Sequence, residues 1–129
     1  MDAQAGFWGY HLMVDCGGLQ LSEEKLNDQE YLLAFVENVL VVSDMKPWGV
    51  PTVMRLTEKD GEFPDSLSGW TIIQLLHTSN MTLHVCDKAK TLFFDLFSCK
   101  QFSNDKVIEI VEQYFDPART RVNFLTRDP

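Results

Sequence analysis

The segment from His77 to Lys100 reads HTSNMTLHVCDKAKTLFFDLFSCK and contains the clearest strand pattern of the chain. Two segments within it, MTLHVC and TLFFDLFSC, are rich in apolar and β-branched residues, and the polar residues 87–90 separate them. Runs of this kind on either side of a short polar link predict the two strands of an antiparallel hairpin. If Cys86 lies opposite Thr91, the register of the whole pair follows from the hydrophobic pattern.

This register gives the hairpin one apolar face and one polar face, because side chains alternate along a strand. The apolar face, which suits a core, holds Met81, Leu83, Val85, Leu92, Phe94 and Leu96. The opposite face gathers Asn80, Thr82, His84, Asp95 and Cys99, with Ser79 at its edge. That face is too polar for a core and unusually rich in reactive groups for a surface.

Three interpretations of the polar face compete. A zinc site would use His84, Cys86 and Cys99, but their spacing resembles no compact ligand pattern, so we predict no metal. A solvated structural face, with Cys99 as a small packing residue, is the second interpretation. The third is nucleophilic chemistry built on Ser79, His84 and Cys99. The residue types alone leave the last two open.

The rest of the chain predicts four further strands and two helices. The strands are expected at Phe7–Cys16, Pro51–Glu58, Gly69–Thr78 and Arg119–Leu125. The order β-α-β-β-β-β-α-β predicts a two-layer α+β sandwich, with both helices on one face of a mostly antiparallel sheet. The other face of the sheet then needs a partner or a site to cover it.

Both helices are predicted from capping residues and apolar periodicity. The first follows Asn27, which with Glu30 forms a plausible capping pair, and the second follows Ser103 and ends before Pro117. The apolar stripes are Leu32, Leu33, Val36, Val39 and Leu40 in the first helix, and Val107, Ile110, Val111, Tyr114 and Phe115 in the second. The segment Lys59–Ser68 between strands is predicted to be a loop.

Composition limits the class of protein. A chain of 129 residues predicts a single domain, residues 1–129. Its net charge of −8 argues against nucleic acid as a partner. No apolar run approaches the roughly 20 residues of a membrane helix, and no export signal precedes the first strand, so we expect a cytoplasmic protein. Three cysteines without a CxxC pair predict free thiols.

The spacing of the hairpin residues resembles a known family. His84 follows Ser79 by five residues, and FFDLFSC ends at Cys99, twenty residues after the serine. This spacing is similar to that of the prokaryotic S-adenosylmethionine decarboxylases, whose motif runs Ser-His-x-Thr-x-His and then Asp-x-Phe-[Ser/Thr]-Cys. The segments GYHLMVD at Gly9–Asp15 and MKPWG, together with Thr71, also resemble family features.

The resemblance implies self-processing. Family members cut the peptide bond before the serine, here Thr78–Ser79, and convert the serine into a pyruvoyl cofactor. The chain would then consist of the pieces 1–78 and 79–129. By the same resemblance, His84 acts as the base in this reaction, and Thr71 supplies a hydroxyl that hydrogen-bonds the intermediate.

The resemblance also implies a decarboxylase of polyamine (spermidine) biosynthesis that acts on a cationic small molecule as a homodimer. In that reaction Cys99 donates a proton to the product. Asp15 matches an acid near the cationic end of the substrate, and Trp48 is a candidate contact for the nucleoside.

The chain departs from the family at several positions. Thr78 and Asn80 replace Glu and His, and Cys86–Lys88 stand where the family has Trp-Pro-Glu, whose Trp and Glu help hold the nucleoside. Three hypotheses therefore stay open: a decarboxylase of S-adenosylmethionine, the same chemistry on a basic amino acid such as ornithine or arginine, and an uncleaved, silent relative that binds a ligand or partner.

Overall fold

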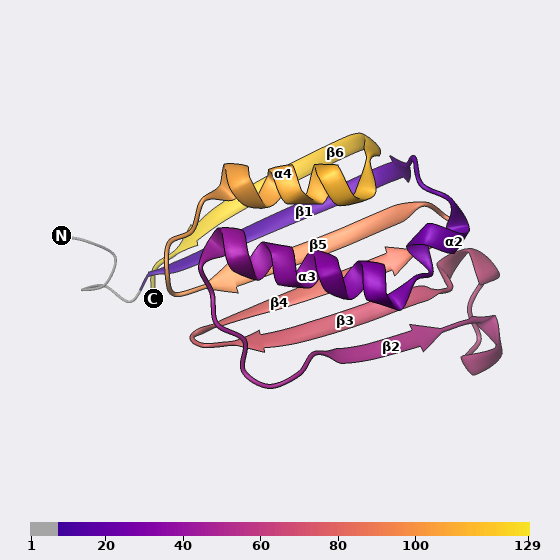
Figure 1. Ribbon diagram of the computed structural model, residues 1–129, viewed down its shortest axis with the longest axis horizontal. Helices are drawn as coiled ribbons and strands as arrows, with labels where there is room; N and C mark the ends of the chain where they lie inside the picture. Colours follow the sequence, from indigo (N-terminus) through magenta and orange to yellow (C-terminus); the bar gives the residue numbers. More distant parts are fainter. Residues whose placement is uncertain (1–7) are drawn as a thin grey trace.

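The computed structural model describes residues 8–129, which form a six-stranded sheet with helices against one face (Figure 1). Neighbouring strands are antiparallel throughout, in the order β2-β3-β4-β5-β1-β6. The strands are β1 (Gly9–Leu19), β2 (Thr52–Leu56), β3 (Gly69–Leu76), β4 (Ser79–Cys86), β5 (Thr91–Ser98) and β6 (Pro117–Arg127). The helices are α2 (Glu23–Leu26), α3 (Gln29–Ser43) and α4 (Asn104–Phe115). The predicted α+β sandwich is confirmed.

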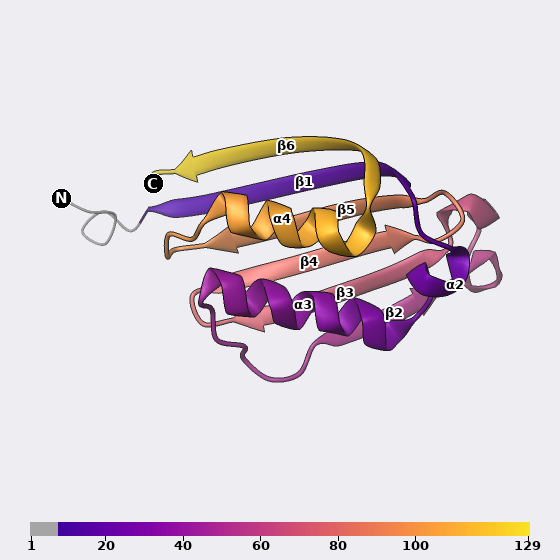
Figure 2. The ribbon, with the colours of Figure 1, turned by 45° about the horizontal axis from the view of Figure 1, so that its top comes forward.

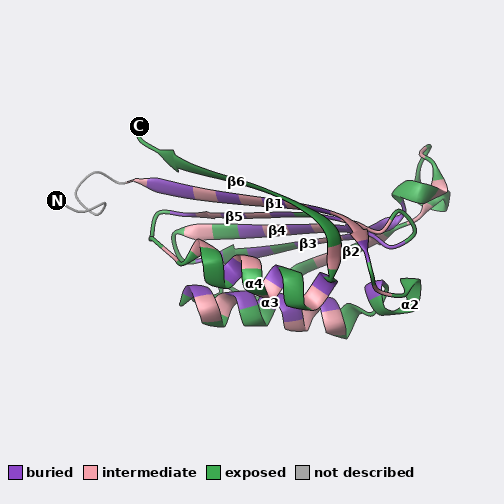
Figure 3. Ribbon diagram, turned by 90° about the horizontal axis from the view of Figure 1, so that it is seen from above, coloured by how far each residue is buried: buried purple, intermediate pink, exposed green. Residues whose placement is uncertain are grey.

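The two longer helices, α3 and α4, lie side by side on the same face of the sheet (Figure 2). The described helices leave the opposite face uncovered, as the view from above shows (Figure 3). We call this side the open face. It carries His11, Met13, Asp15, Met54, Thr71, Ile73, Leu75, Asn80, Thr82, His84, Phe93, Asp95 and Phe97. Within residues 8–129, no helix has the length and apolarity that crossing a membrane requires.

The register predicted for the hairpin is the one the structure has. Cys86 lies opposite Thr91, and His84 lies opposite Phe93. Residues 87–90 form the turn between the two strands. All six residues of the predicted apolar face are buried, because they point toward α3 and α4. The polar face therefore belongs to the open side of the sheet.

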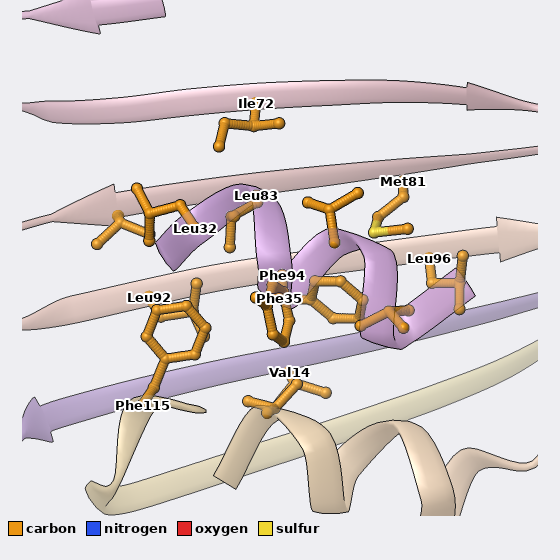
Figure 4. Close-up of a cluster of buried hydrophobic side chains, with 14 of the residues drawn as sticks. Val14, Leu32, Phe35, Ile72, Met81, Leu83, Leu92, Phe94, Leu96 and Phe115 are labelled. Atoms are coloured by element: carbon orange, nitrogen blue, oxygen red, sulfur yellow. The ribbon is translucent and has the colours of Figure 1, made fainter. Parts of the chain in front are cut away.

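The core lies between the sheet and the two longer helices (Figure 4). Phe35 of α3 is its central side chain, with ring centroids 5.5 Å from Phe94 of β5 and 4.9 Å from Phe115 of α4. Both pairs meet edge to face, the arrangement that aromatic rings prefer. Phe35 thus joins the sheet to both helices.

The prediction that Asn27 caps the first long helix is wrong. Asp28 is the N-cap of α3, and its carboxylate accepts hydrogen bonds from the backbone N–H groups of Glu30 and Tyr31. Asn27 instead ends the short helix α2, and its side-chain oxygen accepts a hydrogen bond from the indole N–H of Trp70 at 2.8 Å. The side chain that the local sequence pattern assigns to a helix cap therefore makes a tertiary contact instead. Ser103 caps α4 as predicted.

Several strand boundaries differ from the predicted ones. β1 begins at Gly9, while Phe7 lies outside the described residues, and the strand continues past the expected end at Cys16 to Leu19. Gly18 has φ = 61°, a conformation that costs glycine little, so the strand bends there without stopping. β2 is shorter than predicted and β6 is longer. The segment predicted as a loop, Lys59–Ser68, contains two short 3₁₀ turns.

Candidate active site

The connection between β3 and β4 consists of two residues, His77 and Thr78, and it precedes the expected cleavage point. The structure ends β3 at Leu76, so the strand predicted to reach Thr78 is shorter. Thr78 has φ = 59°, in the left-handed region that β-branched residues avoid. Glycine, asparagine or aspartate normally fills such positions in two-residue hairpin turns. The Thr78–Ser79 peptide bond therefore follows a strained backbone.

The carbonyl of Thr78 and the hydroxyl of Ser79 both have defined partners. The backbone N–H of Cys99 donates a hydrogen bond to the Thr78 carbonyl oxygen at 3.1 Å. The Ser79 hydroxyl donates to Oγ of Ser98 at 2.7 Å, and it also lies 3.3 Å from the carbonyl oxygen of His77. A donor on a carbonyl stabilises negative charge that develops there during attack. The turn thus brings together a serine hydroxyl, a carbonyl that accepts a hydrogen bond and a threonine with positive φ.

Ser98 also lies at the Ser79 end of the sheet, and the sequence did not predict it as a site residue. It is fully buried, and its hydroxyl accepts a hydrogen bond from the backbone N–H of Lys100 at 2.8 Å. A serine on the apolar side of β5 breaks the hydrophobic alternation, which is the signal that would have singled it out.

The thiol of Cys99 is exposed beside the same turn. It lines a hollow of about 310 Å³ at the ends of β1, β5 and β6. The other lining residues are Gly9, Phe97, Arg127, Asp128 and Pro129. The guanidinium of Arg127 lies over the ring of Phe97, 5.3 Å from its centroid. Cys99 is therefore a free, exposed cysteine next to Thr78 at the Ser79 end of the sheet.

Trp48 also lies at this end of the sheet. Its backbone N–H donates to the carbonyl oxygen of Leu75, and its ring meets that of His77 edge to face at 5.2 Å. The indole is 65% exposed, so most of its surface is available to a ligand.

Thr71 and His84 form a second group on the open face. They lie opposite each other on β3 and β4, and Oγ1 of Thr71 is 2.9 Å from Nδ1 of His84. Asp15 lies in the same row across the sheet, because it is opposite Phe93, which is opposite His84. The predicted acid, base and processing hydroxyl thus share one row.

The two groups lie apart within one chain. Five residues of extended β4 separate Ser79 from His84, a distance of about 16 Å at ~3.3 Å per residue. Alternation also directs Ser79 toward the helices and His84 toward the open face. The hairpin brings Cys99 beside Ser79, as expected, but it does not bring His84 or Thr71 there. The physical reason is that an extended strand cannot fold residues i and i+5 together.

The residues at the family's nucleoside-binding positions are engaged elsewhere. Asp87 is buried and forms a two-point ion pair with the guanidinium of Arg55, which lies 5.7 Å from the centroid of the Trp70 ring. Lys88 pairs with Asp65 of the preceding loop. This hydrogen bond lowers the pKa of Asp65 and raises the pKa of Lys88. Asp87 and Lys88 therefore hold β2 and the loop against the hairpin turn.

Residues 10–128 match the family model of S-adenosylmethionine decarboxylase. The chain belongs to this family. Among curated protein sequences, none matches the chain.

The fold also resembles a solved decarboxylase. The crystal structure of the adenosylmethionine decarboxylase from Aquifex aeolicus VF5 matches with a TM-score of 0.73 and 15% sequence identity. The match covers 94% of the present chain and 91% of the other. At this identity the likeness shows the fold that the two proteins share. The family member described here therefore keeps the architecture while its sequence has diverged far.

The Arg55–Asp87 pair gives a stability prediction. Asp87→Ala leaves a partly buried guanidinium without its carboxylate, so we expect the free energy of unfolding to fall by about 3 kcal/mol. Urea denaturation followed by tryptophan fluorescence measures this. Lys88→Ala is the matched control, because it removes an exposed ion pair one residue away and is expected to change stability little. Equal midpoints for the two variants would contradict the structural role of Asp87.

Proposed function

We propose that this family member is a pyruvoyl-dependent decarboxylase that cleaves itself between Thr78 and Ser79. One observation carries the proposal: the Thr78 carbonyl accepts the Cys99 N–H at a strained turn, directly before the Ser79 hydroxyl. Strained residues of this kind concentrate at functional sites, because they persist only where the surrounding structure holds them. A pyruvoyl group generated from Ser79 fits this turn, since its three carbons all belong to residue 79 and water supplies the oxygen of its ketone.

The cleavage uses groups of the chain together with water. The Ser79 hydroxyl attacks the carbonyl carbon of Thr78, so that a C–O ester bond replaces the C–N amide bond and the amine of residue 79 becomes free. The Cys99 N–H stabilises the charge on the attacked oxygen. A base then removes the α-proton of residue 79, the ester oxygen leaves with the carboxylate of Thr78, and hydrolysis with loss of ammonia completes the group. His84 is our candidate for that base.

The resulting pyruvoyl group supplies an electron sink for decarboxylation of a bound amine. Cys99 is the candidate proton donor to the product carbon, because its thiol is exposed beside position 79. Asp15 on the open face and the overall charge of −8 favour a cationic small-molecule substrate. We place the reaction in polyamine (spermidine) biosynthesis in the cytoplasm.

We further propose that the working form is a homodimer in which each site is shared. The argument is that Ser79 and His84 are needed in one reaction yet lie about 16 Å apart along β4. The open face offers the surface for a second copy. Its apolar side chains that water contacts in a single chain include Met54, Ile73, Leu75 and Phe93.

Two-fold symmetry accounts for the sharing. When two open faces pack with their β4 strands antiparallel, the Thr71–His84 row of one chain lies over the Ser79 end of the other, and the reverse also holds. The Ser79 end of each chain and the Thr71–His84 row of the other then form two identical, complete sites. Any second molecule other than an identical chain would complete only one.

The substrate has two candidates, S-adenosylmethionine and a basic amino acid. Lys88 stands where the family has the acid that holds the nucleoside, and Lys88 and Asp87 are both committed to ion pairs. These contacts favour a substrate without a nucleoside, such as ornithine or arginine. Trp48, exposed at the Ser79 end, favours the nucleoside instead, as a stacking surface. We propose S-adenosylmethionine first and the basic amino acids second.

Intact mass spectrometry tests self-cleavage. We expect the purified protein to give two fragments, 1–78 and a pyruvoyl-capped 79–129, while Ser79→Ala gives a single uncleaved chain because the nucleophile is gone. Ser98→Ala is a useful comparison, since it removes only the partner of the Ser79 hydroxyl and should slow cleavage without stopping it. An uncleaved wild-type chain would leave only the hypothesis of a silent relative.

Co-expression of two defective variants tests the shared site. Ser79→Ala and His84→Ala should each stay uncleaved alone. In a mixed dimer, the His84→Ala chain keeps its Ser79 and meets the intact His84 of its partner, so we expect that chain to be cleaved. Co-expressed His84→Ala and Thr71→Ala form the control, because every mixed site still lacks one group. If cleavage in the first mixture stays absent, the site lies within one chain.

Release of carbon dioxide identifies the substrate. We expect the cleaved protein to release labelled carbon dioxide from carboxyl-labelled S-adenosylmethionine. Cys99→Ala should still be cleaved but should form little correctly protonated amine, because the proton donor is missing. Release from ornithine or arginine, with none from S-adenosylmethionine, would establish the second candidate.

A further inference from the structure

His84 has a partner on each of its two ring nitrogens. Oγ1 of Thr71 lies 2.9 Å from Nδ1, and Sγ of Cys86 lies 3.6 Å from Nε2. Cys86 is 3% exposed, and its sulfur also lies 3.8 Å from the carbonyl oxygen of Leu67. His84 and Cys86 are two residues apart on β4, so their side chains leave the strand on the same side.

The positions of the protons follow from what each group can donate. The Leu67 carbonyl only accepts, so the Cys86 thiol donates its hydrogen there and presents sulfur lone pairs to the imidazole. Nε2 of His84 then carries the hydrogen that points at sulfur. In a neutral imidazole this leaves Nδ1 bare, and Nδ1 accepts the hydroxyl hydrogen of Thr71.

We propose that Cys86 is a positioning residue that holds His84 in the Nε2–H tautomer and keeps Nδ1 as its basic nitrogen. The tautomer stands on the contacts above, and its catalytic consequence rests on the proposed function. In self-cleavage Nδ1 is the atom that takes the proton, through the Thr71 hydroxyl or directly. The imidazole cannot rotate without losing both contacts.

The loop between β2 and β3 contains the Leu67 carbonyl to which the Cys86 thiol donates. Leu67 ends the second 3₁₀ turn of that loop, and the neighbouring Ser68 is 1% exposed. The Ser68 hydroxyl donates to Asp65 at 3.2 Å, and Asp65 pairs with Lys88. The loop is thus anchored on the hairpin turn that follows Cys86, which fixes the carbonyl that orients the thiol. The turn at residues 87–90, where the family's nucleoside-binding residues are missing, thus helps to hold His84 in place through this loop.

Nitrogen-15 NMR of the histidine rings tests the tautomer directly. The measurement uses the Ser79→Ala chain, so that it does not depend on cleavage, and His84→Gln assigns the signals. We expect His84 to show a protonated Nε2 and a bare Nδ1. Cys86→Ser should preserve this pattern because its hydroxyl oxygen accepts, and Cys86→Ala should lose it. Cys16→Ala is the control, since that buried thiol on β1 contacts Thr120 and not His84.

The rate of self-cleavage is the second readout. We expect Cys86→Ala to slow cleavage about tenfold, as loss of an orienting partner typically does, and Cys86→Ser to restore it to within about threefold. An unchanged His84 tautomer in Cys86→Ala overturns the inference, and so does a wild-type cleavage rate in that variant. A wild-type chain that is never cleaved overturns the proposed function instead, and the NMR pattern then decides the role of Cys86 by itself.

Discussion

The pairing of β4 with β5 determines which side chains of the sheet are buried against the helices and which remain on the open face. With Cys86 opposite Thr91, six apolar side chains face α3 and α4, and His84 and Asp95 face the open side. A shift of one residue would exchange the two faces and expose the core. The same register brings the Cys99 N–H to the Thr78 carbonyl at the far end of the hairpin. The register of β4 and β5 therefore determines both the burial of the core and the geometry of the candidate site.

The proposed site departs from local structural preference where the chemistry is expected. A β-branched residue with positive φ at Thr78 is unfavourable for the turn alone, and the pairing of β3, β4 and β5 around it supplies the stability that holds it. Such local conflicts mark functional positions in otherwise consistent folds. The separation of Ser79 from His84 follows from the same regularity, because straight strands keep the two groups at opposite ends.

Alternation and turn residues predicted the hairpin, its register and its core, since these depend on neighbours in the chain. Where a tertiary contact competed, the prediction was wrong: Asn27 binds the Trp70 indole, and Asp28 caps the helix. Ser98 and Arg55 were not singled out, because their partners are Ser79 and Asp87, and those contacts exist only after the strands pair.

The order of residues along the chain is enough to identify the groups available for chemistry: Ser79, His84 and Cys99 at motif spacing, with Thr71 eight positions before the serine. The fold alone shows that Thr71 and His84 are neighbours, through the pairing of β3 with β4, and that this pair lies far from Thr78 and Cys99. Spacing along a chain counts residues, but distance between side chains depends on which strands pair. That pairing arises from burial of the apolar face, a property of the whole sheet.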